Sequence, residues 1–246
     1  MLSRFTTIFV RKLATKSGVF APLSNRVFLF NYFEKPPLEE KEFVKNWTET
    51  SKYVQARDHF ISLHLHNSKG PNTRFEWVNF VVCDSDDICI FGKPDPRWLE
   101  RMKEGAKLGL TPKPGQYSEV ASYNGNPLDT EPKERSETAR FLITGVTADE
   151  SISAEDMESN WKDWMKTDFI HQQLKANNNL KDSMLYKLVR SPVPYFRYTV
   201  RTELSEMDEK EGYALADVVN QQKCHDGVET FTGFYSIFTN MFYKKE

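Results

Sequence analysis

The order of predicted secondary structure in this chain repeats once. Residues 26 to about 123 read as strand, helix, strand, strand, helix, strand, and residues 139 to 246 repeat that order. A single unit of this kind forms a sheet with helices on only one face, so its other face must be covered by a second layer. A chain with two units can supply both sheets itself.

The first unit spans residues 25–123. It begins with the apolar strand 27–33, and the pair Pro36 and Pro37 then precedes a helix with acidic residues in its first turn. The helix is predicted to bury a stripe formed by Phe43, Trp47, Thr50 and Val54. Alternating patterns predict the remaining strands at 60–66, 74–83 and 117–123, with a short helix at 96–108.

Residues 124–137 contain prolines, turn residues and charges without apolar periodicity, which predicts a linker. The second unit, 138–246, has predicted strands at 139–146, 184–189, 195–203 and 230–243. One long helix is predicted after Ser153, with Met157, Trp161, Trp164 and Met165 on one side. A last helix is predicted to open at Ser205 and Asp208.

The N-terminal segment differs in charge from the rest of the chain. It carries Arg4, Arg11, Lys12 and Lys16, and no acidic residue occurs before Glu34. This composition is typical of a mitochondrial presequence, so residues 1–24 are predicted to be a targeting segment for the mitochondrial matrix. A basic N-terminal arm is the alternative.

Composition excludes several classes of function. The formal net charge of -2 offers no basic field for nucleic acid. No apolar run reaches the length of about 18 residues that a membrane span requires. Cys83, Cys89 and Cys224 lack the spacing of a zinc site, and their odd number and spread do not suggest a disulfide framework. No glycine-rich phosphate loop, nucleophile elbow or HExxH motif occurs.

The segment from Phe28 to Ser85 resembles an antibiotic-biosynthesis-monooxygenase domain of the dimeric α+β barrel superfamily. The resemblance lies in an ordered set of features: Asn31, the proline pair, Phe43 and Trp47, Phe60-Ile61-Ser62, Leu65-His66, Arg74-Phe75 and Val78-Asn79. The second unit is more weakly similar to the ethyl-tert-butyl-ether-degradation type of the same superfamily. That similarity rests on the tryptophan-bearing helix and the Lys187-Leu188-Val189 strand.

The resemblance implies an α+β fold in which tandem ferredoxin-like units form a pseudodimer around a central ligand cavity. A homodimer remains possible. It also implies a cofactor-independent monooxygenase acting on a small aromatic or apolar molecule. The alternatives are a non-catalytic barrel, either a carrier or a subunit of a mitochondrial assembly, and a haem-binding or haem-degrading protein.

In this interpretation Asn31 and His66 are the catalytic residues. The predicted substrate contacts are Ser62, His64, Trp77, Asn79, Trp164, His171 and Arg197. Each has a structural alternative: a backbone-satisfied asparagine, structural histidines, a core tryptophan and a solvated helix histidine. Arg197 and Arg201 are predicted to share a strand face, where they would bind an anion or protect a sheet edge.

Two departures in the first unit and one in the second weigh against haem chemistry. Cys83 stands where many relatives have tryptophan, and the helix 96–108 contains no histidine. His171 follows Trp164 by seven residues where haem-degrading relatives have ten, which places it on another helix face. These departures favour the non-catalytic alternative.

Overall fold

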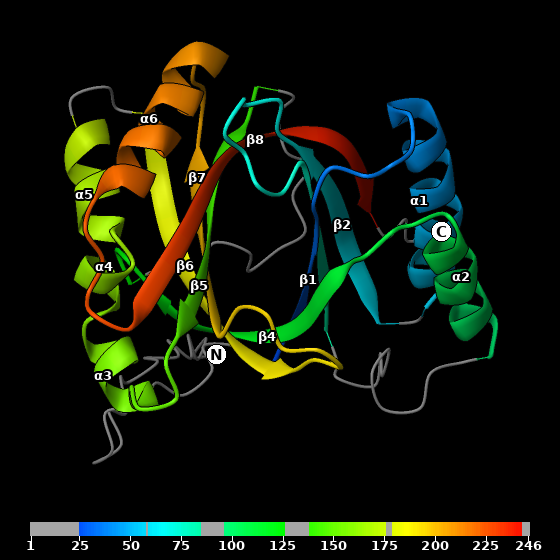
Figure 1. The fold of residues 1–246 in the computed structure, drawn as a ribbon, viewed down its shortest axis with the longest axis horizontal. Helices are drawn as coiled ribbons and strands as arrows, with labels where there is room; N and C mark the ends of the chain where they lie inside the picture. The colour runs from blue at the N-terminus through cyan, green and yellow to red at the C-terminus, as the bar shows by residue number, and fades with distance from the viewer. Residues whose placement is uncertain (1–24, 58, 85–95, 126–137, 176–178, 243–246) are drawn as a thin grey trace, which may run out of the picture.

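The computed structural model describes residues 25–57, 59–84, 96–125, 138–175 and 179–242. Eight antiparallel strands close into a barrel, and the helices lie outside it in two groups on opposite sides (Figure 1). The prediction of a mixed α+β fold is confirmed. The predicted targeting segment and most of the predicted linker lie outside the described residues.

The first half of the chain contributes four strands and two helices. They are β1 (Val27–Phe33), α1 (Glu40–Gln55), β2 (Phe60–Asn67), β3 (Trp77–Cys83), α2 (Pro96–Lys107) and β4 (Lys113–Ser122). Their spatial order is β4-β1-β3-β2. Strand β4 starts four residues before the predicted position, and β3 starts three residues after it.

The second half repeats this arrangement with a more divided helical layer. Its elements are β5 (Arg140–Ala148), α3 (Ala154–Ser159), α4 (Trp161–Trp164), α5 (Thr167–Leu174), β6 (Leu180–Arg190), β7 (Tyr198–Leu204), α6 (Glu209–Gln221) and β8 (Val228–Phe242). The strand order is β6-β7-β5-β8, and the pairs β2–β8 and β4–β6 join the two halves.

The single helix predicted after Ser153 is three helices. Ser153 caps the first, as predicted, by accepting a hydrogen bond from the Asp156 N–H at 3.0 Å. Lys166 interrupts the path between α4 and α5 because its φ of 61° lies in the left-handed region. Its buried ammonium donates to the Val219 carbonyl near the end of α6, at 3.1 Å.

The interior of the barrel is filled by aromatic side chains. Alternate residues of the strands point inward, and the rings pack at centroid distances such as 4.8 Å for Phe30–Phe80. The cluster includes Phe28, Phe30, Tyr32, Phe75, Phe80, Tyr117, Phe141, Tyr186, Phe196 and Tyr235. Among the described residues, large rings from both halves therefore occupy the centre of the barrel, where the resemblance implied a ligand cavity.

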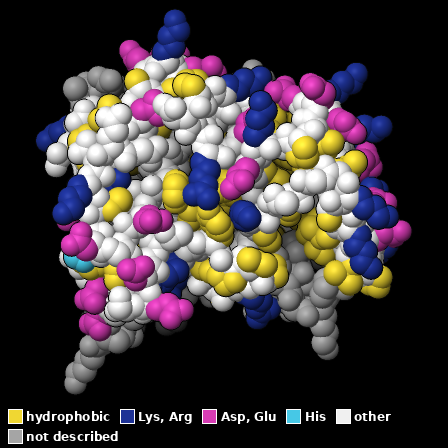
Figure 2. Space-filling view, in the orientation of Figure 1, with side chains coloured by type: hydrophobic (Ala, Val, Ile, Leu, Met, Phe, Trp, Pro, Cys, Tyr) yellow, Lys and Arg dark blue, Asp and Glu magenta, His cyan; other side chains and the backbone are white. Residues whose placement is uncertain are grey.

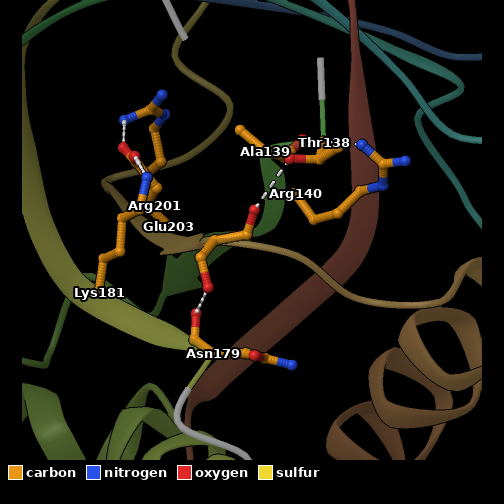
Figure 3. Close-up of polar contacts among 8 residues, drawn as sticks. Thr138, Ala139, Arg140, Asn179, Lys181, Arg201 and Glu203 are labelled. Atoms are coloured by element: carbon orange, nitrogen blue, oxygen red, sulfur yellow. Dashed lines mark hydrogen bonds and ion pairs between the residues drawn. The ribbon is translucent and has the colours of Figure 1, made fainter. Parts of the chain in front are cut away.

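Several inward-pointing residues are charged. Arg201 is 0% exposed, and its guanidinium lies over the rings of Phe141 and Phe80 at 4.2 and 4.6 Å. Figure 3 shows its contact with Glu203, at 3.8 Å, and the contact of Glu203 with Lys181, at 2.9 Å. Charged side chains also cover the two helical sides of the molecule, whereas hydrophobic side chains gather between them (Figure 2).

No helix in the described part of the chain is long and apolar enough to span a membrane.

Candidate functional site

A pocket lies between the outer face of the first sheet and the two helices that cover it. We call it the α1–α2 pocket. Its volume is about 70 Å³, and side chains from β1, β2, β3, α1 and α2 line it. The polar lining residues are Asn31, Asn46, Thr50, Ser51, Asn79 and Arg101.

Two asparagines form the floor of the pocket. Asn31 on β1 and Asn79 on β3 are register partners on adjacent antiparallel strands, and both side chains line the pocket. The Oδ1 atom of each is buried and has no hydrogen-bond partner among the described residues. A buried polar atom without a partner costs about 1–3 kcal/mol, so such atoms are uncommon in folded proteins unless a ligand or water satisfies them.

The helices add a third buried polar group that lacks a hydrogen-bond partner in the described part of the chain, the indole of Trp47, and one charged side chain, Arg101. Trp47 of α1 is 6% exposed and lines the pocket, and its indole Nε1 is buried without a hydrogen-bond partner among the described residues. Arg101 of α2 lies at the solvent side, where it donates to Glu104 at 3.0 Å. Trp98, Met102 and Leu63 supply apolar wall.

The sequence prediction that combined Asn31 with His66 is wrong about their placement. Asn31 lies on the outer face of the barrel wall with Leu29 and Phe33, whereas His66 faces the interior and packs edge-on against Phe141 at 4.9 Å. Both faces of these strands are apolar, so the alternation of the sequence did not show which face was which.

The other polar residues of β2 share the placement of His66. The His64 ring approaches Phe80 of the interior cluster, and its Nδ1 is 2.8 Å from Asn240 Oδ1 on β8. Ser62 lies two residues earlier on β2 and is buried. The predicted set of Ser62, His64 and His66 thus belongs to the barrel and not to the α1–α2 pocket.

Trp77 lies on the outer face, as Asn79 does, but beyond the pocket. Its ring packs against Phe43 at 4.9 Å and Phe238 at 5.1 Å. It is 1% exposed. This geometry corresponds to the core role that the sequence offered as the alternative for this residue.

In the second unit, one outer-face pair of polar residues is satisfied by hydrogen bonds between side chains. Ser183 on β6 and Thr202 on β7 are register partners, as Asn31 and Asn79 are, and their hydroxyl oxygens are 2.7 Å apart. His171 of α5 reaches Ser183 Oγ through its Nε2 at 2.8 Å and stacks on Tyr123 at 3.4 Å. This polar pair on β6 and β7 is therefore satisfied by protein groups, unlike the pair on β1 and β3 within the described ranges.

His171 is the basis of a prediction about pH. Burial lowers its pKa from the usual value of about 6.5 to about 4. The unfolded chain binds a proton at His171 between these values and the folded chain does not, so stability is lost as the pH falls from about 6.5 towards 4. Between pH 7.5 and 5.0 we expect a loss of about 1–2 kcal/mol from this residue.

Urea unfolding at the two pH values measures this loss. In His171→Gln, which keeps an amide near Ser183 but does not titrate, the drop in unfolding free energy should be smaller by that amount. Equal drops in the two proteins would show that His171 does not carry this pH dependence.

The last two predicted contacts lie away from the pocket. Trp164 stacks on His225 at 3.8 Å, at a surface hollow of about 300 Å³ beside Asp163 and Cys224. Arg197 donates to the carbonyls of Asp149 and Ile152 at 3.1 and 3.0 Å, which ties down the chain before α3. Because Phe196 joins the interior cluster, the predicted shared face of Arg197 and Arg201 is wrong; Arg197 precedes β7 and lies outside.

The sequence did not identify Arg101, Trp98 or Met102 as pocket residues. All three belong to α2, which was considered only for its lack of histidine. The amphipathic pattern of this helix was the available signal, since its apolar face had to pack on the sheet above Asn31.

Comparisons with known proteins give a family and a fold. A family model described as a domain of unknown function, DUF7153, matches residues 60–236. None of the curated proteins compared with this sequence matches it. The chain is similar to the crystal structure of an anthrone oxidase-like protein, with 11% identity and a TM-score of 0.60, covering 91% of this chain and 95% of the other.

It is also similar to a monooxygenase, described as putative, from Fusobacterium nucleatum, with 8% identity and a TM-score of 0.53. That alignment covers 91% of this chain and 100% of the other. At these identities the two similarities show a shared fold and nothing further.

Proposed function

This chain belongs to the family described as a domain of unknown function, DUF7153, and because that family gives no activity, we propose one from the geometry of the α1–α2 pocket. The pocket binds a small aromatic molecule that carries a hydroxyl group and oxygenates it without a bound cofactor. The observation that carries the proposal is the set of buried, unpartnered polar atoms of Asn31, Asn79 and Trp47 in one pocket. The names of the two similar structures suggested the reaction class.

The polar atoms define how a hydroxylated ring would lie. A phenolic hydroxyl can donate to a carboxamide oxygen and accept from the indole N–H at the same time. Trp98, Met102 and Leu63 would contact the ring. Met102 is unbranched, so its side chain can move to admit a ring larger than the 70 Å³ of free volume.

The reaction balances with dioxygen as the only co-reactant. A phenol with a free ring position loses its hydroxyl proton to water, and the phenolate ring carbon forms a bond to oxygen. Loss of the ring proton with cleavage of the O–O bond releases one oxygen atom as water and leaves a quinone. The substrate supplies all four electrons, and the Trp47 indole N–H would donate a hydrogen bond to the phenolate oxygen.

A haem group does not fit this pocket. Its described lining residues include no histidine, and its volume is far below that of ordinary pockets for larger ligands, about 300–1,000 Å³. His171, in the second unit, forms a hydrogen bond with Ser183 and stacks on Tyr123, so it does not lie at this pocket. We therefore propose chemistry without haem.

The strand order supports the tandem ferredoxin-like organisation as a second part of the proposal. Each half has its fourth strand beside its first and its third between its first and second, and two inter-half pairs close the barrel. Of the two catalytic residues that the resemblance to an antibiotic-biosynthesis-monooxygenase domain implied, the α1–α2 pocket contains Asn31 and not His66. One chain would then do what two subunits do in dimeric relatives.

A non-catalytic carrier is the second candidate. None of the described residues lining the pocket is acidic or a histidine, so a general base is not among them. A binding protein needs only the polar floor and the apolar walls. Such a protein would hold the same ligand and leave dioxygen untouched.

An oxygen electrode separates the two candidates. The purified full chain, in the presence of a chelator, should consume dioxygen with single-ring phenols faster than buffer does. Light scattering should show that the active species has the mass of one chain. Asn31→Leu and Asn79→Leu should each reduce the rate at least about tenfold, because each removes an acceptor from the floor.

Asn72→Leu is the matched control. Asn72 lies on an exposed loop and donates to Asp217 of α6, so its variant should retain the wild-type rate. Wild-type rates in both pocket variants would exclude this pocket as the site. Binding of phenols without oxygen consumption would support the carrier.

A further inference from the structure

We infer that the α1–α2 pocket selects single-ring aromatic ligands with two hydroxyl groups over ligands with one. This inference rests on the proposed function, because it assigns the ligand class of the same pocket. It follows from an inventory of the hydrogen bonds that the pocket leaves unmade.

Among the described residues, the fully buried, unpartnered atoms of the pocket lining are two acceptors and one donor. The acceptors are Asn31 Oδ1 and Asn79 Oδ1, and the donor is the indole N–H of Trp47. A ligand with one hydroxyl group can donate to one acceptor and accept from the indole, which leaves the second amide oxygen without a donor. A second hydroxyl group supplies that missing donor.

The geometry allows one ring to reach both amides. Asn31 and Asn79 lie directly opposite each other in the β1–β3 pairing. Side chains of such partners begin about 4.5–5.5 Å apart, which is within the span of two hydroxyl groups and their hydrogen bonds on one edge of a ring. The free volume of about 70 Å³ favours one ring over several fused rings.

The second unit has a polar register pair on a different strand pair, β6–β7, whose hydroxyl groups are satisfied. Its register pair, Ser183 and Thr202, bond to each other, and His171 reaches Ser183 from the helix. The first unit has two carboxamides at an outer-face register pair, with no corresponding helix side chain on their oxygens among the described residues. A donor-bearing ligand would supply the hydrogen bonds that these two oxygens lack.

Anaerobic calorimetric titration of the full chain tests the inference with near-isosteric pairs. Catechol is compared with 2-methylphenol, and resorcinol with 3-methylphenol, so that each pair differs by a hydroxyl in place of a methyl group. At least one dihydroxybenzene should bind about tenfold more tightly than its methyl counterpart. Binding within twofold in both pairs would overturn the inference.

Variants assign the preference to atoms. Asn79→Leu and Asn31→Leu should each reduce the preference below about threefold, whereas Trp47→Phe should weaken both members of a pair and leave their ratio. Asn72→Leu should change nothing. A preference that survives in both asparagine variants would also overturn the inference.

The outcomes for ligand class and for catalysis are separable. Selective binding without oxygen consumption in air supports the ligand class and contradicts the monooxygenase. Oxygen consumption at equal rates and affinities for both members of each pair supports the monooxygenase and contradicts the ligand class.

Discussion

Replacing Asn31 or Asn79 by leucine is expected to make the ligand-free protein more stable, by about 1–3 kcal/mol for each substitution. Each replacement removes a buried carboxamide oxygen that has no partner among the described residues and adds a side chain of similar shape to an apolar wall. Urea unfolding measures the gain, with Asn72→Leu as the surface control expected near zero.

The sign of this effect identifies the role of the two amides. If they were structural, their loss would destabilise the fold. A gain in stability together with loss of ligand binding indicates residues kept for a ligand at a cost to the free protein. Destabilisation by more than about 1 kcal/mol in both variants would contradict this assignment.

Arg201→Met is expected to have the largest destabilising effect, about 3 kcal/mol. The guanidinium is fully buried between two aromatic rings beside Glu203, and its removal leaves the Glu203 carboxylate with one cation fewer in a low-dielectric interior. Glu203 keeps Lys181 at 2.9 Å, which limits the cost. Thermal or urea unfolding gives the value.

A double-mutant cycle shows whether charge causes the effect. Glu203→Gln should recover at least about 1 kcal/mol when it is added to Arg201→Met, because the neutral amide does not need the lost cation. The exposed Arg97→Met on α2 serves as a control expected within about 0.5 kcal/mol of the wild type. Strict additivity of the two interior substitutions would assign the cost to packing alone.

Much of the fold was predictable because the two units obey strong local rules. The alternating strands and the stop at Pro36 and Pro37 placed β1, α1 and β2 to within a few residues. The break at Lys166 was not predictable, because a left-handed lysine is stabilised by a tertiary contact with Val219 that no local pattern encodes.

The candidate site was predictable only in part, and for a physical reason. The alternation of side chains along a strand placed Trp77 and Asn79 on one face of β3, and the family resemblance pointed to Asn31. However, β1 and β3 are buried on both faces, so the alternating pattern could not distinguish the face that meets the helices from the face that lines the barrel interior. His66 was therefore grouped with residues on the other side of the wall, and Arg101 was missed.

The two strand pairs that join the halves, β2–β8 and β4–β6, determine when the barrel can close during synthesis. Strand β2 pairs with β8 from Ser62↔Phe242 to Asn67↔Ser236, so one edge of β2 has no partner strand until β8 is present. Until β8 has been synthesised, β5 lacks its partner residues 228–236 and β2 lacks its partner residues 236–242, so each presents a row of unpaired backbone groups that another chain could join. The barrel can therefore close only when β8, the eighth of its strands along the chain, is available to pair with both β2 and β5.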